Sequence, residues 1–269
     1  MSIIEEVRHL ITKKNNGIIQ LIIVNLAFFL LLNIAKAYAF FTHTDPSALI
    51  QLVGLSPYWE SFTRAPWGMV TYMFVQVDVF HLLSNMLWLY WMGQIFENLT
   101  SNRLLILTYF GGGILGGIAF VMFGSGSNIL ASYATLIGSS AAVLAIVVSS
   151  AVLAPNYTIN VMFFGPVKLK YLALVSFILT SLIDLNENTG GKIAHIGGAI
   201  FGLLFAIAFK QKKSTIKVVY KRPISNELYN EIKVSNERRV DQILDKISKS
   251  GYDSLNKEEK EFLFKQSGK

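Results

Sequence analysis

Residues 193–209, IAHIGGAIFGLLFAIAF, form an uncharged apolar run with a single histidine near its start. A helix needs roughly 20 apolar residues to cross the hydrocarbon of a bilayer. Five more runs of low charge have lengths near or somewhat below this value, namely 18–35, 79–99, 104–123, 140–153 and 166–183. The sequence therefore predicts an all-α membrane protein, a bundle of six transmembrane helices.

Two of these runs differ from a simple spanning helix. The run at 140–153 has only 14 residues, which predicts a helix that begins below the membrane surface, with residues 124–138 dipping in ahead of it. Irregular backbone at that depth must be buried in protein or line a wet cavity. The run at 18–35 is followed by Ala37-Tyr38-Ala39, a pattern typical of signal-peptide cleavage sites. Its apolar part is longer than that of most signal peptides, which favours a retained helix.

The composition agrees with a membrane protein and excludes several chemistries. Hydrophobic residues make up 52% of the chain and charged residues 15%. Cysteine is absent, which excludes disulfides, thiolate metal sites and a cysteine nucleophile. The chain has four histidines, no H-E-x-x-H motif and no pair of carboxylates inside an apolar run. We therefore expect neither a metal nor another cofactor.

The charges predict the topology. Residues 210–269 hold 15 Lys and Arg against 9 Asp and Glu, so most of the net charge of +7 lies there. A basic segment directly after an apolar span lies more often against anionic lipid than on nucleic acid, so we expect the lipid bilayer as a partner and no nucleic acid. Lys and Arg of the short loops gather on one side, which places both termini in the cytoplasm. The predicted parts are an N-terminal cytoplasmic segment (1–16), a six-span domain (17–209) and a basic linker with a small helical cytoplasmic tail (210–269).

The tail carries the signals of two helices. Apolar residues recur at helical spacing at Val240, Ile243, Leu244 and Ile247. Gly251 is a stop signal for this helix. Asn256, followed three residues later by Glu259, predicts a capping box at the start of a second helix, with Phe262 and Leu263 on its buried face.

Polar residues at membrane depth are costly and are therefore candidates for function. They lie in three segments, with His81, Ser84 and Asn85 at the start of the second run, Ser139 and Ser140 after Gly138 at the start of the fourth, and His195 at the start of the sixth. The second, fourth and sixth spans all begin on the outer side in the predicted topology. We therefore expect the three segments to lie at similar depth and to form one site.

The residue types in these segments indicate nucleophilic catalysis. Serine becomes a nucleophile when a base takes its proton, and histidine is the usual base, so Ser140 and His195 form a candidate pair. Asp and Glu are absent at the required depth, which predicts a dyad rather than a triad. The unpaired backbone N–H groups around Ser139 at the helix start, together with His81 and Asn85 on one helix face, are candidate donors to an oxyanion.

Glycine predicts how the two helices meet. Gly198 and Gly202 follow His195 at i+3 and i+7 and form a small stripe along which another backbone can approach closely. Glycine and serine in membrane helices are most often packing residues, and a lone histidine is as often structural as functional. The catalytic interpretation therefore depends on the three segments together.

Together the segments resemble the signature of a known family. The G-x-S at 138–140, the H-x-x-x-N at 81–85 and the A-H-x-x-G-x-x-x-G at 194–202 are similar to the motifs of rhomboid intramembrane serine proteases, and they occur in the same order on the expected spans. The resemblance covers residues 17–209 and implies a rhomboid-like bundle in the inner (cytoplasmic) membrane of a bacterium.

The resemblance also implies the roles of individual residues. Ser140 is the expected nucleophile and His195 the base, and His81 and Asn85 help to bind the oxyanion. The expected substrate is a single-span membrane protein, cut near its outer end. Three positions depart from the family pattern: Ala141 stands where glycine is usual, Leu144 where an aromatic residue often packs on the histidine, and Gly68 follows Trp67 where arginine is common.

Two other functions fit a polytopic helical protein. A catalytically silent rhomboid-like protein would bind client membrane helices, but such relatives typically lack the serine or the histidine, and both are present here. A transporter normally needs an ionisable pathway, whereas Glu97 and Asp184 sit at span ends. The sequence favours the protease.

Overall fold

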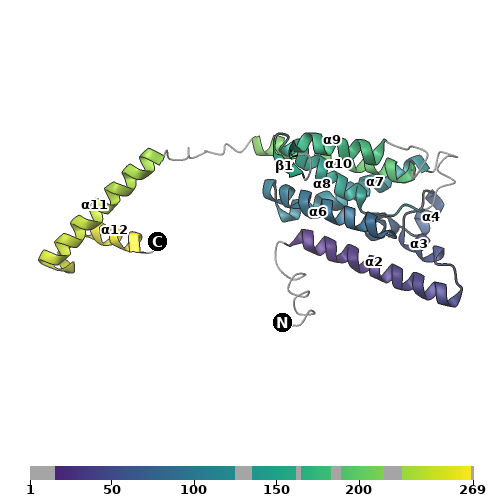
Figure 1. Cartoon of the computed structure of the whole chain (residues 1–269), viewed down its shortest axis with the longest axis horizontal. Helices are drawn as coiled ribbons and strands as arrows, with labels where there is room; N and C mark the ends of the chain where they lie inside the picture. Colours follow the sequence, from purple (N-terminus) through teal and green to yellow (C-terminus); the bar gives the residue numbers. More distant parts are fainter. Residues whose placement is uncertain (1–15, 125–134, 162–164, 183–188, 215–225, 268–269) are drawn as a thin grey trace. The chain divides into compact units, whose positions relative to one another are not determined.

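The computed structural model describes residues 16–124, 135–161, 165–182, 189–214 and 226–267. The chain divides into two compact units, Met1–Thr215 and Ile216–Lys269 (Figure 1). Nearly all of the predicted N-terminal segment and most of the segment predicted to dip into the membrane lie outside the described residues.

The first unit is mostly helical, as predicted. Its elements, in chain order, are α2 (Gly17–Thr42), α3 (Ser47–Val53), α4 (Trp59–Arg64), α5 (Gly68–Thr71), the 3-10 turn η1 (Tyr72–Phe74), α6 (Val79–Leu99), α7 (Asn102–Gly124), α8 (Ser140–Leu153), β1 (Thr158–Val161), β2 (Gly165–Lys168), α9 (Leu169–Ser181) and α10 (Thr189–Ser214).

Several of these helices have the length and composition of membrane spans. Among the described residues, α2, α7 and the Thr189–Gln211 part of α10 are long and apolar enough to cross a bilayer, and α8 and α9 are shorter apolar helices. α6 has 21 residues, but His81, Asn85 and Glu97 are among the polar side chains that lower its mean hydropathy. The structure thus supports a helical membrane protein, and the number of spans stays a prediction.

The helices overlap the predicted runs, but α2, α9 and α10 differ clearly in their bounds, and α10 (Thr189–Ser214) begins before and ends after the predicted run 193–209. α6 and α8 begin and end at the predicted residues, whereas α2 continues past Lys36 to Thr42. The predicted start of the fifth helix, at Pro166, was wrong. Residues 165–168 form strand β2, which pairs with residues 158–161 of β1 in an antiparallel hairpin. Proline is tolerated both in the first turn of a helix and at the edge of a two-stranded hairpin, so the strand pairing and not Pro166 itself decides here. α9 therefore begins at Leu169.

α8 lies at the centre of the first unit, where it contacts α6, α7, α9 and α10 (Figure 1). Ten of its residues are buried. Small residues permit this packing, since Gly198 and Gly202 of α10 lie directly against the backbone of α8 at Ala141 and Ala145. By contrast, α2 and α9 expose large apolar side chains such as Leu31 and Leu179, as lipid-facing helices do.

The connection between α2 and α6 is held to the bundle through backbone groups. The N–H and carbonyl of Leu55 pair with those of Leu136 at 2.9 and 2.8 Å, which ties this connection to the segment just before α8. The indole Nε1 of Trp67 donates to the Leu52 carbonyl at 2.8 Å. Trp67 therefore fixes the connection internally although Gly68 replaces the arginine common in the family.

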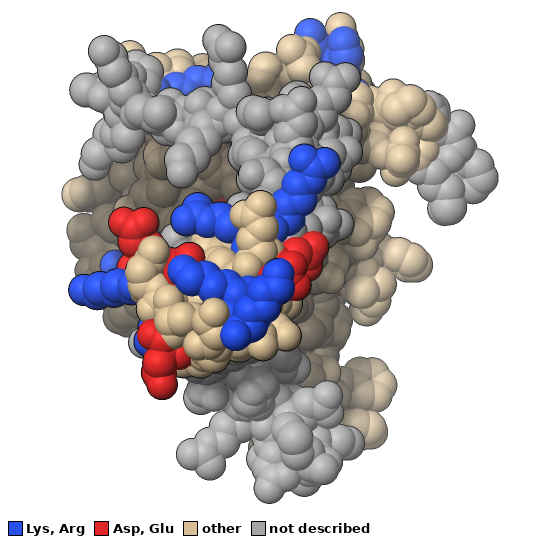
Figure 2. Space-filling model, turned by 90° about the vertical axis from the view of Figure 1, so that its left-hand side faces the viewer, with Lys and Arg blue, Asp and Glu red and all other residues tan. Residues whose placement is uncertain are grey.

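The second unit consists of α11 (Asn226–Ser250), the 3-10 turn η2 (Tyr252–Ser254) and α12 (Lys257–Ser267). The predicted capping box is confirmed: the Asn256 N–H donates to Glu259 Oε2, and the Glu259 N–H donates to Asn256 Oδ1, both at 2.8 Å. Of the predicted apolar face, Ile243 is buried whereas Leu244 is exposed. The face drawn in Figure 2 shows Lys and Arg interspersed with Asp and Glu.

Candidate active site

A glycine sets the start of α8. Gly138 has a φ of 116°, a backbone conformation that L side chains rarely adopt. A Cβ at this position would also lie 3.1 Å from Cε1 of His81. The chain turns at Gly138, Ser139 is the N-cap and Ser140 is the first residue of α8. Glycine at position 138 therefore lets the serine at the helix start lie close to α6.

Ser140 and His195 form a hydrogen-bonded pair across two helices. Oγ of Ser140 and Nε2 of His195 are 2.6 Å apart, and Nδ1 of His195 lies 2.9 Å from the Thr180 carbonyl oxygen. A carbonyl only accepts, so Nδ1 carries the proton and Nε2 is left as the acceptor for the serine hydroxyl. This is the tautomer that a general base requires.

The Thr180 carbonyl orients the imidazole here, a task that an aspartate performs in a triad. Thr180 lies in the last turn of α9, where carbonyl groups have no partner within the helix. Sequence reasoning did not find this contact. The sequence gives no signal of it, because the partner is a main-chain carbonyl.

A cavity of about 140 Å³ joins the predicted residues into one site. Its lining comes from α6, α8, α9 and α10 and consists of His81, Ser84, Asn85, Trp88, Ser140, Val143, Leu144, Val147, Ser176, Thr180 and His195. Four of the five side chains predicted for the dyad and the oxyanion therefore face the same cavity. Leu144, where an aromatic residue is usual in the family, lines it too.

Ser139, the fifth of these, faces away from the cavity into a buried polar cluster. Its Oγ accepts from Nε2 of Gln76 at 3.2 Å, and Oε1 of Gln76 accepts from Nδ2 of Asn85 at 3.0 Å. Nε2 of Gln76 also donates to Oδ1 of Asn25 at 3.0 Å. Sequence reasoning missed Gln76 and Asn25. Asn25, a polar residue inside the first apolar run, could have been noticed on that ground.

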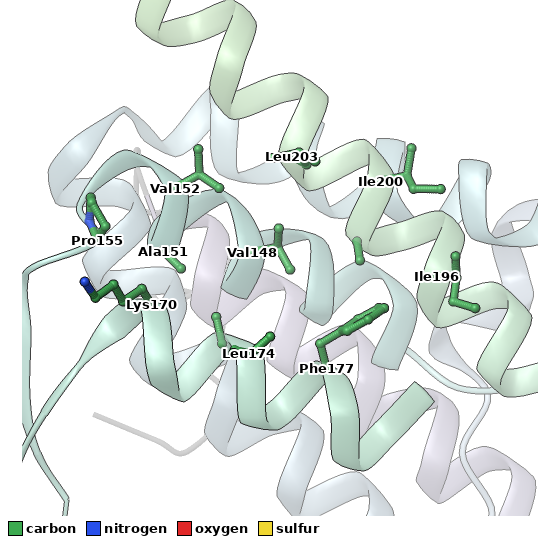
Figure 3. A pocket seen from close by; sticks show the side chains of 12 residues that line it. Val148, Ala151, Val152, Pro155, Lys170, Leu174, Phe177, Ile196, Ile200 and Leu203 are labelled. Carbon is green, nitrogen blue, oxygen red and sulfur yellow. The ribbon is translucent and has the colours of Figure 1, made fainter. Parts of the chain in front are cut away.

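A second hollow lies beside the site and has a different character. It is a groove of about 500 Å³ along α8, α9 and α10, and its lining is apolar apart from Lys170 at one end (Figure 3). Phe177 and Ile196 of this groove are chain neighbours of Ser176 and His195 in the smaller cavity. Lys170 is the one ionisable side chain that lines the groove, whereas the hydrogen-bonded pair of Ser140 and His195 lies in the smaller cavity, which is therefore the candidate active site. Among the described residues, we also find no cluster of His, Cys, Asp and Glu that could hold a metal ion.

Comparison with known proteins identifies the family. The family model of the Rhomboid domain matches residues 63–212, more than half of the chain, and the chain belongs to the rhomboid family. A second family model, described as a family of unknown function (DUF6576), matches residues 226–269. No curated protein matches the chain. The first match contains every residue that lines the cavity, and the second covers α11 and α12.

Proposed function

We propose that the protein is an intramembrane serine endopeptidase that uses Ser140 as nucleophile and His195 as general base. The observation that carries this proposal is the 2.6 Å contact between Ser140 Oγ and His195 Nε2, with Nδ1 held by the Thr180 carbonyl. Membership of the rhomboid family, which consists generally of serine intramembrane proteases, supports it.

The reaction follows from the geometry of the pair. Ser140 Oγ passes its proton to His195 Nε2 as it attacks the carbonyl carbon of the scissile peptide. The imidazolium is stabilised by its Nδ1–H bond to Thr180 and then gives its proton to the leaving amine. Water enters next, His195 takes a proton from it, and the resulting hydroxide releases the acyl group from Ser140. The serine regains its proton from His195 at the end of the cycle.

The negative charge of each tetrahedral intermediate requires hydrogen-bond donors. Asn85 and His81 line the cavity with Ser140, and the backbone N–H groups of residues 139 and 140 at the start of α8 lack helical partners. We assign the oxyanion to these donors. Each donor of this kind contributes roughly 10² to 10³ in turnover in other serine proteases.

The substrate and its orientation follow from the predicted topology. With six spans (α2, α6, α7, α8, α9 and α10) and both termini in the cytoplasm, the starts of α6, α8 and α10 lie toward the outer leaflet. The substrate is then a single-span membrane protein cut near its outer end. The bilayer that holds both is the bacterial cytoplasmic membrane.

The test is cleavage of a fluorogenic single-span substrate in proteoliposomes, together with labelling by a serine-directed phosphonate located by mass spectrometry. We expect label on Ser140, and loss of cleavage in Ser140→Ala on the order of the 10⁶-fold seen for soluble serine proteases. Ser139→Ala should keep substantial activity, because its hydroxyl points away from the cavity. Cleavage by Ser140→Ala at the wild-type rate would refute the assignment. Helix binding with neither cleavage nor label would identify a catalytically silent binder instead.

A further inference from the structure

Gln76 is a buried side chain whose every polar atom has a partner. It lies between η1 and α6 and is 0% exposed. Its oxygen accepts from Asn85, and its nitrogen donates to Asn25 and to Ser139. A glutamine amide has two N–H donors and one acceptor oxygen. In these three contacts both N–H groups donate and the oxygen accepts one hydrogen bond. The orientation of the amide is therefore fixed from three sides.

A backbone carbonyl determines the direction of this chain of hydrogen bonds. Nδ2 of Asn25 donates to the Leu21 carbonyl at 2.8 Å and to the Tyr109 hydroxyl at 3.2 Å. Because the Leu21 carbonyl can only accept, the nitrogen of Asn25 must face it and Oδ1 must face Gln76. Gln76 then has to present its nitrogen to Asn25 and its oxygen to Asn85. The amide of Asn85 is thereby turned with Nδ2 toward Gln76.

The geometry points to Gln76 as the positioning residue for the oxyanion donor Asn85. This inference rests on the proposed protease function. One N–H of Asn85 is held by Gln76, and the other N–H of the same nitrogen is the donor left for a substrate oxyanion. Gln76 also holds Ser139, the residue before the nucleophile, so a single side chain sets the spacing between the oxyanion donor and the start of α8.

Two variants separate the contact with Asn85 from the other two contacts. Gln76→Met keeps an unbranched side chain of similar volume but removes all three hydrogen bonds. Gln76→Glu keeps an oxygen for Asn85 and replaces the nitrogen that serves Asn25 and Ser139. Thr108→Val is a matched control, because the Thr108 hydroxyl is equally buried, lies in the same unit and has no hydrogen-bond partner.

The experiment measures kcat, KM and Tm for these variants in proteoliposomes, each in the wild-type and the Asn85→Ala background. For Gln76→Met we expect a loss of turnover of about 10²-fold, the usual effect of displacing a reacting group by about 1 Å, with KM nearly unchanged. Gln76→Glu should retain turnover within about 10-fold of wild type, since its remaining oxygen still accepts from Asn85. In the Asn85→Ala background Gln76→Met should add almost nothing, because two residues that act through one contact are not additive.

The outcomes are distinct. Wild-type turnover in Gln76→Met overturns the inference, and so does a full further loss from Gln76→Met when Asn85 is already alanine. If Gln76→Met does not fold, Gln76→Glu decides, and a loss of 10²-fold or more with normal Tm and KM overturns the assignment through Asn85. Failure of the proposed function gives another pattern, in which wild type and Thr108→Val neither cleave nor take label at Ser140.

Discussion

Adding one methyl group at Gly198 tests whether close packing of α10 on α8 holds the dyad together. A Cβ at this position would lie 2.9 Å from the carbonyl carbon of Ala141 and closer still to its oxygen. Ordinary contact between carbon atoms begins near 3.5 Å, so the two helices would have to separate by roughly 1 Å. Ala141 follows the nucleophile directly, and Gly198 lies one turn from His195. The same displacement would stretch the 2.6 Å contact between Ser140 and His195 to about 3.6 Å, beyond hydrogen-bond range.

We therefore expect Gly198→Ala to lose about 10²-fold in turnover and to be destabilised by about 1–3 kcal/mol, as is usual for an overpacked contact. The matched control is Ala199→Val, which adds bulk at the next residue of α10, a residue that lines the apolar groove, where space is available. Turnover on a single-span substrate and Tm are measured on the same preparations. If Gly198→Ala matched wild type in both, α8 and α10 would not be in contact at this point and the packing explanation would be wrong.

Three further variants test the remaining assignments. Asn85→Ala and His81→Ala should each lower kcat by roughly 10² to 10³ with KM little changed, whereas a structural role would lower Tm and impair both kinetic constants together. The Cβ added in Gly202→Ala would lie against the backbone of α8 at Ala145, one turn further from the dyad. This variant should therefore lower Tm as Gly198→Ala does, but its loss of turnover should be smaller. In the second unit, the Asn256 backbone N–H and the Lys246 side chain hold the pKa of Glu259 below its ordinary value. The ionised carboxylate of Glu259 therefore stabilises α12 fully at pH values above the pKa that Glu259 has in the unfolded chain, and this stabilisation is lost as the pH falls through its lowered pKa in the folded chain. The measurement is an NMR titration of the full chain. An ordinary pKa for Glu259 would contradict the capping arrangement.

Much of the fold could be predicted because it depends on local patterns, and the pairing of Ser140 with His195 could be predicted from topology. The bounds of α6 and α8 follow from apolar runs that end at charged or turn-forming residues, and the capping box at Asn256 depends on a spacing of three residues. That Ser140 and His195 lie close together was predicted from topology and depth alone. The hairpin before α9 was missed because hydropathy does not distinguish the apolar residues of a short strand from the first turn of a helix.

The groups that orient the dyad and the oxyanion donor could not be predicted in the same way, for a physical reason. The orienting group for His195 is a main-chain carbonyl, which every residue has, so the side chain of Thr180 gives no signal of it. The orientation of the Gln76 amide depends on hydrogen bonds to Asn25, which lies 51 residues earlier in the chain, and to Ser139, which lies 63 residues later. Contacts between residues so far apart in the chain depend on how α2, α6 and α8 pack against one another. In addition, Gln76 lies outside the apolar runs, so no periodic pattern of apolar residues marks it as buried. The orientation of Asn85 is thus set from α2 through Gln76. Asn25 does not line the cavity. Substitutions at Asn25 should nevertheless change turnover, through the hydrogen bonds that join Asn25 to Gln76 and Gln76 to Asn85.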